Sequence, residues 1–368
     1  MNTEINFQKF KNAVTLTERV AGKHLTLPVL SCVLLDIKKN SLTLKATNLD
    51  VGIEVSIPAK TNLEAQVAIP SHTLSAFLAQ IPDTENNIKI EIIDQNVHMH
   101  TSHSKVVLKT MLVDDFPSIP RPTDPDRVLL PRNSLIKGFK SVWYSSSLSN
   151  VKPELSSVYV YNEPSNIIFV ATDSFRLAEK KIPVNKKLLN TDILIPFKNV
   201  SELVRVLDNM PDEVQVETNK NLITISGNGI YVVSRIIDGV FPDYKQILPK
   251  SFVTEVVVLK QDMINSLKVS NVFSDKFNQV KFSIDPDNKT FEISTKNVDV
   301  GENKTHIDAS ITGDKLELNF NSKYITDCFQ SIDADSISIQ FSGMNRPMVI
   351  RPVSGEQSFS YLVMPMNR

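Results

Sequence analysis

One apolar helix pattern occurs three times along the chain at a nearly constant interval, and this repeat restricts the fold more than any other feature. In each copy, four apolar residues follow the spacing i, i+3, i+4, i+7, which places them on one face of a helix. The copies run from Leu74 to Ile81, from Val200 to Leu207 and from Ile325 to Ile332. They begin 126 and then 125 residues apart. The pattern therefore predicts three copies of one folding unit.

A second helix is expected earlier in each copy, over about residues 7–21, 134–145 and 262–273. Short alternating segments between and after the helices predict antiparallel strands, about eight in each copy. Residue pairs such as Asn228-Gly229 mark turns between them. Ser71 or Asn321 could cap the later helix. The predicted fold class is α+β, with three repeated domains that each pack two helices on antiparallel sheets.

Two proline-rich stretches, Ile119–Arg127 and Leu248–Phe252, are typical of linkers between the copies. They place the domains at residues 1–126, 127–249 and 250–368. A single copy has too few helices to cover its sheets, and its edge strands would stay open unless they pair with the next copy. The two terminal copies still leave one free edge each. A symmetric ring closed by a second chain is one arrangement that removes both free edges.

The charge and the cysteine content narrow the class of protein. The 368 residues include 40 Lys and Arg against 41 Asp and Glu, a net charge of −1, which argues against nucleic-acid binding through bulk positive charge. Two distant cysteines, Cys32 and Cys328, fit a reducing compartment. No apolar run approaches the roughly 18 residues that span a bilayer, and the N-terminus lacks the apolar segment of a signal peptide. We expect a soluble, cytoplasmic protein.

Few residues suggest catalysis or a bound cofactor. His98, His100 and His103 form the only histidine cluster. No cysteine or carboxylate follows at metal-ligand spacing, so an exposed strand face is the better interpretation. Gly227 and Gly229 lack the Lys-Ser/Thr pair of a phosphate loop, and no Gly-x-Ser-x-Gly motif is present. We therefore expect no catalytic residue, no metal and no cofactor. An enzyme on a repeated scaffold and a monomeric interaction scaffold are the alternatives.

Basic residues lie opposite the apolar stripes of the predicted helices, for example Lys137, Lys140, Lys198 and Arg205. The ordinary interpretation is a solvated face. Helices that repeat with the domains would, however, present their basic residues to the inside of a ring. There a duplex, with one charge per about 1.7 Å, would be attracted without any reading of its sequence. The segment Phe359–Arg368 predicts a final strand whose exposed Met and Leu could line a groove for partner peptides.

Seven stretches spread over the whole chain resemble the bacterial DNA polymerase III β subunit family, the sliding clamps. They are LTLPVLSCVLL (25–35), ATNLDVGIE (46–54), DDFPSIP (114–120), ATDSFRLAEKK (171–181), IPFKNVSELVRVLD (195–208), DGVFPDYKQILP (238–249) and the terminal VMPMNR. The resemblance implies a non-catalytic processivity factor, in which three clamp domains per chain form half of a closed head-to-tail homodimeric ring around double-stranded DNA. It also implies the replicative polymerase, the clamp loader and other clamp-motif proteins as partners.

In this family, a hydrophobic pocket between the second and third domains and the C-terminal tail binds short motifs of partner proteins. Carried over residue by residue, the resemblance implies a pocket formed by Leu155, Thr172, Ser174, Phe175, Arg176, Leu177, Pro242, Ile247, Val363, Met364, Pro365 and Met366. Ser174-Phe175 stands where family members often have Gly and then His or Tyr. Asn367 precedes Arg368 where the commoner ending has no residue between Met and Arg.

The resemblance also implies DNA-facing and interface positions. Lys198 and Arg205 match the family's DNA-facing positions, and His24 stands where some members have Arg. Lys137 and Lys140, expected from the basic helix faces described above, complete the DNA-facing set. In the family, the first domain of one chain meets the third domain of the other. The matching residues here lie in the strand Lys105–Leu108 and at the end of a helix in the third domain. The expected interface anchors are Val106, Leu108, Val272 and Phe273.

Overall fold

The structure is a computed structural model that describes residues 2–22, 26–61, 64–184, 192–354 and 358–366. The described residues form two compact units. The first unit comprises the described residues up to 136 together with residues 198–236. The second comprises residues 137–184, 192–197 and the described residues from 237 onwards.

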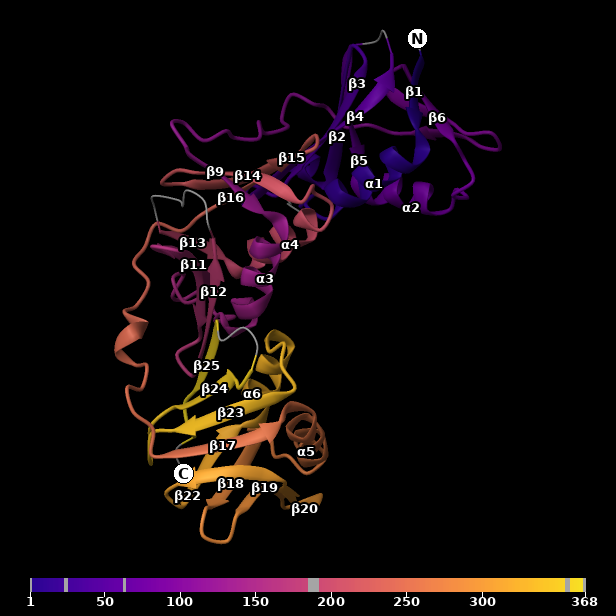
Figure 1. The fold of residues 1–368 in the computed structure, drawn as a ribbon. Helices are drawn as coiled ribbons and strands as arrows, with labels where there is room; N and C mark the ends of the chain where they lie inside the picture. The colour runs from indigo at the N-terminus through magenta and orange to yellow at the C-terminus, as the bar shows by residue number, and fades with distance from the viewer. Residues whose placement is uncertain (1, 23–25, 62–63, 185–191, 355–357, 367–368) are drawn as a thin grey trace. The chain divides into compact units, whose positions relative to one another are not determined.

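The helices occur where the repeat predicts them (Figure 1). The earlier helix of each copy is α1 (Phe7–Glu18), α3 (Arg132–Val142) and α5 (Lys260–Val272). The later helix is α2 (Ser71–Ala79), α4 (Phe197–Leu207) and α6 (Ser322–Cys328). The later helices begin 126 and 125 residues apart, which is the predicted interval. Leu74, Val200 and Ile325, which begin the three apolar stripes, are completely buried.

One of the two predicted helix caps is correct. The Asn321 side chain accepts the backbone N–H groups of Lys323 and Tyr324 at the start of α6. The Ser71 prediction is wrong, because Pro70 occupies the N-cap position of α2 and Ser71 is already helical. The expected helix over 134–145 is also shorter than predicted, since α3 ends at Val142 and a 3-10 turn, η2 (Trp143–Ser145), follows it.

The first unit is built on one 12-stranded antiparallel sheet. Its strands are β1 (Asn2–Asn6), β2 (Cys32–Lys38), β3 (Ser41–Thr47), β4 (Val51–Lys60), β5 (Ala65–Pro70), β6 (Asn87–Ile93), β7 (Asn96–His100), β8 (Lys105–Leu108), β9 (Asp126–Pro131), β14 (Glu213–Thr218), β15 (Leu222–Gly227) and β16 (Ile230–Arg235). In the middle of the sheet, β4 of the first copy pairs with β16 of the second, with Val51 opposite Ser234. The strand β8 forms one end of the sheet.

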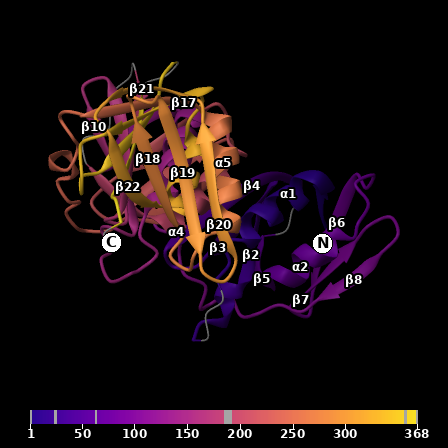
Figure 2. The same ribbon diagram turned by 90° about the horizontal axis from the view of Figure 1, so that it is seen from below.

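The second unit contains a nine-stranded and a four-stranded sheet. In order across the nine-stranded sheet lie β13 (Ile193–Pro196), β10 (Ser157–Glu163), β11 (Asn166–Thr172), β12 (Arg176–Pro183), β25 (Phe359–Val363), β24 (Met348–Pro352), β23 (Ser336–Phe341), β17 (Thr254–Leu259) and β21 (Ala309–Gly313). The four-stranded sheet has the order β20 (Gly301–Ile307), β19 (Thr290–Asn297), β18 (Gln279–Asp285) and β22 (Leu316–Asn321). Figure 2 shows β18, β19 and β20 side by side, and α5 packs on β19 and β20.

Both large sheets cross a boundary between copies of the repeat. In the second unit, β12 of the second copy pairs with β25 of the third, with Leu177 opposite Leu362. The prediction that neighbouring copies pair through their edge strands is therefore confirmed. The second repeat supplies strands to both compact units. The two units therefore do not coincide with the three repeats. At Asp308 the chain passes from β20 to β21, which belong to different sheets.

A glycine allows one helix to pack closely on the nine-stranded sheet. Phe169 of β11 meets the ring of Phe139 edge to face, with 5.1 Å between the ring centroids. At Gly138 of α3, a Cβ atom would lie 2.3 Å from the ring of Phe169. Both rings are almost completely buried. Any larger side chain at position 138 would therefore push α3 away from the nine-stranded sheet.

Candidate functional site

A tight turn between β11 and β12 holds Phe175 at the surface. Ser174 adopts a left-handed conformation with φ of +78°, which glycine would adopt at lower cost. The Asp173 carboxylate accepts the backbone N–H groups of Phe175 and Arg176, both at 3.0 Å. The Thr172 hydroxyl donates to the carbonyl of Arg176 at 2.6 Å. These bonds fix the turn, and the Phe175 side chain is left 60% exposed.

Arg176 connects this turn to helix α6. Its guanidinium donates to Asp173 at 3.0 Å, to Asp327 of α6 at 2.6 Å and to the carbonyl of Tyr144 at 2.6 Å. It also lies over the ring of Tyr324, 4.6 Å from the ring centroid. Burial opposes the positive charge, but the surrounding acidic and tyrosine side chains outweigh it and raise the pKa of Arg176. The arginine therefore stays charged and ties the turn to the helix.

The C-terminal tail passes beside the turn and completes a hollow. The Met364 N–H donates to the carbonyl of Phe175 at 2.8 Å, and the Met366 N–H donates to that of Asn319 at 2.7 Å. Next to these contacts lies a hollow of about 510 Å³. It is lined by Phe175, Lys276, Phe277, Asn278, Asn321, Tyr324, Met364, Pro365 and Met366. Aromatic and methionine walls with a few polar groups at the rim suit a short peptide with apolar side chains.

The residues implied by the resemblance divide into three groups. Phe175, Met364, Pro365 and Met366 line the hollow, and Ser174 and Arg176 shape its turn. A second group lies beneath the surface, since Leu155, Thr172, Leu177 and Val363 are at most 8% exposed. Pro242 and Ile247 are exposed on the segment that follows β16. Asn367 and Arg368 lie outside the described residues.

Five lining residues were not among the sequence predictions: Lys276, Phe277, Asn278, Asn321 and Tyr324. Two of them have a signal in the sequence. Tyr324 directly precedes Ile325 and lies off the apolar stripe of α6, so its ring is free to face elsewhere. Phe277 is an aromatic residue within the polar segment SDKFNQ, and it is 57% exposed. An exposed aromatic side chain beside polar residues is a common mark of an interaction surface.

The expected DNA-facing residues differ in their surroundings. Lys137 and Lys140 on α3 and Lys198 on α4 are exposed. Arg205 is half-buried, and its guanidinium lies 2.5 Å from the Glu202 carboxylate, so much of its charge is balanced locally. It also reaches the carbonyls of Thr15 and Leu16 in α1 at 3.4 Å. His24 lies outside the described residues.

The expected interface anchors lie near two strands that end their sheets, β8 in the first unit and β20 in the second. Val106 is half-buried, but Leu108 is only 5% exposed and packs inside its own unit. Val107, between them, is 52% exposed. At the end of α5, Val272 is 65% exposed and Phe273 is half-buried. The most accessible apolar groups at these positions are therefore Val107 and Val272.

The histidine cluster lies on and beside β7. His98 and His100 occupy alternate positions of the strand, and His100 lies opposite Lys105 of β8 and Lys89 of β6. Within the described part of the chain, no three His, Cys, Asp or Glu side chains are placed to hold a metal ion.

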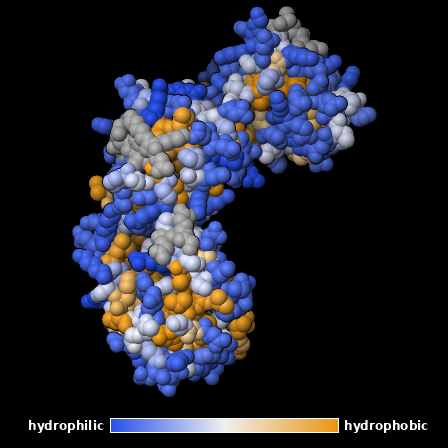
Figure 3. All heavy atoms as spheres, in the orientation of Figure 1, coloured by the Kyte–Doolittle hydropathy of each residue, from blue (hydrophilic) through white to orange (hydrophobic). Residues whose placement is uncertain are grey.

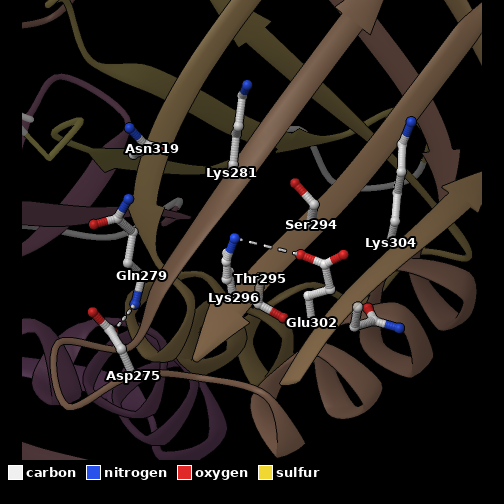
Figure 4. A pocket seen from close by; sticks show the side chains of 10 residues that line it. Asp275, Gln279, Lys281, Ser294, Thr295, Lys296, Glu302, Lys304 and Asn319 are labelled. Atoms are coloured by element: carbon white, nitrogen blue, oxygen red, sulfur yellow. Dashed lines mark hydrogen bonds and ion pairs between the residues drawn. The ribbon is translucent and has the colours of Figure 1, made fainter. Parts of the chain in front are cut away.

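A second hollow, of about 640 Å³, lies on the exposed face of the four-stranded sheet (Figure 4). Three lysines surround it, and each has a glutamate partner. Lys296 lies 3.8 Å from Glu302, and the other two pairs, Lys281–Glu317 and Lys304–Glu292, are both at 2.8 Å. Because the charges balance, this face has no surplus positive charge for an anion.

The described helices are all too short or too polar to cross a membrane. Figure 3 shows several hydrophobic patches on the surface, some of them on the part of the second unit that carries β17 and β23.

Comparison with known proteins gives matches along the whole chain. Residues 1–120 match the N-terminal domain of the DNA polymerase III beta subunit, residues 129–243 match its central domain, and residues 245–367 match its C-terminal domain. Among curated relatives, the beta sliding clamp of Staphylococcus epidermidis is 24% identical over 100% of this chain and 99% of its own. The beta sliding clamp of Synechocystis is 26% identical over 96% of both chains.

Solved structures share the fold. The DNA polymerase III beta subunit of Thermotoga maritima superposes with a TM-score of 0.93 at 24% identity, over 100% of this chain and 99% of its own. The DnaN sliding clamp of Pseudomonas aeruginosa, solved bound to griselimycin, gives a TM-score of 0.94 at 22% identity over the whole of both chains. Three domains, each with two helices on antiparallel sheets, are thus confirmed as predicted from the repeat, and their clamp fold is confirmed as the resemblance implied.

Proposed function

Because this chain belongs to the DNA polymerase III beta subunit family, we propose that it is a DNA sliding clamp, the non-catalytic processivity factor of a bacterial replicative polymerase. The observation that carries the proposal is the match of all three family domains, in order, over almost the whole chain. Two copies close head to tail into a ring around duplex DNA. We place the three domains at residues 1–126, 127–249 and 250–368, and the protein in the cytoplasm.

Ring closure uses the two sheet ends. β8 ends the sheet of the first unit, and β20 ends the four-stranded sheet of the second. A strand at the end of a sheet offers backbone N–H and C=O groups to another chain. Pairing β8 of one protomer with β20 of the other would satisfy both ends, and twofold symmetry would repeat the contact. Val106, Val272 and Phe273 supply the apolar contacts, with Val107 beside them.

DNA contact needs only a weak, sequence-independent attraction. The exposed Lys137, Lys140 and Lys198 lie on the helices α3 and α4. At physiological salt, their charges act over about 8 Å and attract phosphates without fixing a register. A closed ring cannot leave the duplex sideways, so retention does not require strong binding and the ring can slide. Arg205 contributes less, because Glu202 balances its charge.

The hollow beside Phe175 and Met364 is the docking site for partner proteins. A replicative polymerase that carries a short apolar motif would be held next to its template at high effective concentration, which raises processivity. The clamp loader and other DNA-handling proteins with such a motif would compete for the same site.

Retention on circular DNA tests this function directly. The protein, loaded onto nicked circular DNA by a clamp loader, should remain bound during gel filtration and should be lost after a restriction enzyme linearises the DNA. Equal loss from both forms would contradict a topological link. Sedimentation separates the alternative of a monomeric scaffold, since a ring has twice the chain mass of 41.2 kDa.

A further inference from the structure

A connector, defined here as residues 237–253, joins β16 to β17 and packs along one face of the nine-stranded sheet (Figure 1). Its ends are fixed by backbone hydrogen bonds, from Ile237 to Leu194 and from Val253 to Phe341, both at 2.8 Å. Between these ends only a 3-10 turn, η3 (Tyr244–Gln246), gives it regular structure. The middle of the connector must therefore be held on the sheet by side chains.

A buried polar contact holds that middle. Tyr244 is only 5% exposed, and its hydroxyl donates to the carboxylate of Glu179 on β12, itself 6% exposed. The hydroxyl of Tyr161 lies 2.8 Å from that of Tyr244. Because Tyr244 uses its only O–H on Glu179, Tyr161 donates to Tyr244. Burial and the carboxylate raise the pKa of Tyr244, so the hydroxyl keeps the proton that it donates.

Two other contacts flank this bond. Phe241 stacks on Tyr159 with 4.8 Å between the ring centroids. Lys245 donates to Glu163 at 2.9 Å, but its side chain is 55% exposed, and an exposed ion pair adds little stability. A hydrogen bond to a charged, buried acceptor is the stronger kind, and leaving such an acceptor without its donor is costly. The Tyr244–Glu179 bond is therefore the principal polar anchor of the connector.

The anchor lies in the same side-chain cluster as the partner pocket. Leu177 precedes Glu179 by two residues on β12, so both side chains lie on one face of the strand. Leu177 and Tyr244 belong to one buried cluster, and Met364, which lines the hollow, packs against that cluster. Pro242 and Ile247, the exposed connector residues that the resemblance assigns to the pocket, flank Tyr244 in sequence at two and three residues' distance. The position of Tyr244 therefore determines the positions of Pro242 and Ile247.

We propose that Tyr244 and Glu179 are positioning residues of the partner-peptide site, whose buried hydrogen bond holds the connector in place so that Pro242 and Ile247 contact the bound peptide. This inference rests on the proposed function, because it assumes that a partner peptide binds here. A connector that is docked for only part of the time raises the apparent Kd by the inverse of the docked fraction. Peptide affinity therefore depends on two side chains that never touch the peptide.

The test is Tyr244→Phe, which removes one hydroxyl and keeps the ring. The probe is a fluorescent peptide that copies the C-terminus of the replicative polymerase, titrated against the full-length protein by anisotropy. We expect a Kd about tenfold higher, which corresponds to a docked fraction of about one tenth. The matched control is Tyr159→Phe, whose hydroxyl bonds to Asp192 at 2.6 Å and not to the connector. Its Kd should equal that of the wild type.

Two further readouts separate positioning from general stability. The Ile247 amide donates to the Tyr244 carbonyl at 3.1 Å, so its hydrogen exchange should accelerate in Tyr244→Phe and slow again when peptide is added. The second readout is rescue. Adding Glu179→Gln to Tyr244→Phe removes a buried charge that the half-exposed Lys181, 3.7 Å away, balances only in part, and we expect the Kd to return to within about threefold of the wild type.

The outcomes are distinct. If the wild type binds the peptide and Tyr244→Phe binds it equally well, the positioning role is wrong and the clamp function stands. If the wild type does not bind the peptide, the docking site and the positioning role both fail. Should Tyr244→Phe not fold, Glu179→Gln alone keeps a neutral acceptor, and we expect two- to threefold weaker binding. Unchanged affinity in that variant would also overturn the inference.

Discussion

The guanidinium of Arg176 lies 2.6 Å from the carboxylate of Asp327, a contact between residues 151 positions apart in the chain. Arg176 begins β12 beside the turn that carries Phe175, and Asp327 lies in α6, one turn of helix after Tyr324. The Arg176 side chain is 10% exposed and that of Asp327 is 27% exposed, so salt screens this pair only weakly. Phe175 and Tyr324, which face the same hollow, are thereby held as one wall.

Asp327→Asn should weaken the wall formed by Phe175 and Tyr324, although Asp327 itself does not touch the peptide. Loss of a charge-assisted hydrogen bond of this kind should lower the free energy of unfolding by about 1–2 kcal/mol and weaken peptide binding several-fold. Guanidinium unfolding and anisotropy titration measure the two effects. The control is Asp333→Asn, an exposed carboxylate close in sequence. Equal peptide affinity for both variants would mean that Arg176 does not transmit the position of α6 to the turn.

Phe175→Ala and Met364→Ala should each weaken partner-peptide binding by about tenfold or more, because both remove apolar surface from the proposed docking site. Sedimentation should still give a dimer. Val240→Ala is the control, since this side chain is 89% exposed on the connector. Leu177→Ala should behave differently, because it creates a cavity in the core and costs about 2–5 kcal/mol of stability. Wild-type peptide affinity in Phe175→Ala and Met364→Ala would place the docking site elsewhere.

Charged substitutions on the two sides of the proposed interface, near the sheet ends β8 and β20, should open the ring. Val107→Asp on β8 and Val272→Asp at the end of α5 would each bury a carboxylate in the proposed interface, which is costly unless it finds a partner. Sedimentation equilibrium should shift from twice 41.2 kDa towards 41.2 kDa. Leu148→Asp, at a side chain that is 82% exposed outside the proposed interface, should leave the mass unchanged. A dimer that survives both interface variants would contradict the β8–β20 contact.

Lys198 and Arg205 should differ in their effect on DNA, although both lie on α4. Removing one phosphate contact lowers the slope of log K against log salt by about 0.9. We expect a change of this size for Lys198→Ala, measured on short linear duplexes. Arg205→Ala should change the slope less, because Glu202 already balances its charge, and should lower stability instead. The reverse order would show that Arg205 leaves Glu202 when DNA binds.

Lowering the pH should selectively remove the contribution of Asp36 to the free energy of unfolding. This carboxylate on β2 is 3% exposed, and Lys45 and Gln66 reach it at 2.9 and 3.1 Å. Burial alone would raise the pKa of Asp36, but the hydrogen bonds and the charges of Lys45 and Lys38 outweigh it and lower the pKa. The stabilisation is therefore complete above the unfolded value of about 3.9 and disappears as the pH falls through the folded pKa.

Asp36→Asn should accordingly cost about 1–2 kcal/mol at pH 7, and the cost should shrink below about pH 4. Guanidinium unfolding of both proteins at several pH values gives this difference. A cost that is independent of pH would mean that the loss comes from packing and not from the charge.

The repeat, the helices and the turns could be predicted because each depends on residues close together in the chain. The apolar stripes have the period of a helix whatever lies around them, and α2, α4 and α6 begin at the predicted interval. Asn228, at the predicted Asn228-Gly229 turn, adopts a positive φ angle of 48°, as turn residues do. The family resemblance added the pocket residues of the tail, of which Met364, Pro365 and Met366 line the hollow next to one another.

Only the tertiary structure decided what depends on residues far apart. The pairing of β4 with β16 and of β12 with β25 carries the sheets across the repeats. The same long-range packing buries Leu177, brings Phe277 and Tyr324 to the pocket and sets Tyr244 on Glu179. Local periodicity specifies which face of an element is apolar, but not which distant element covers it. That choice is made by the packing of the whole chain, where each contact depends on all the others.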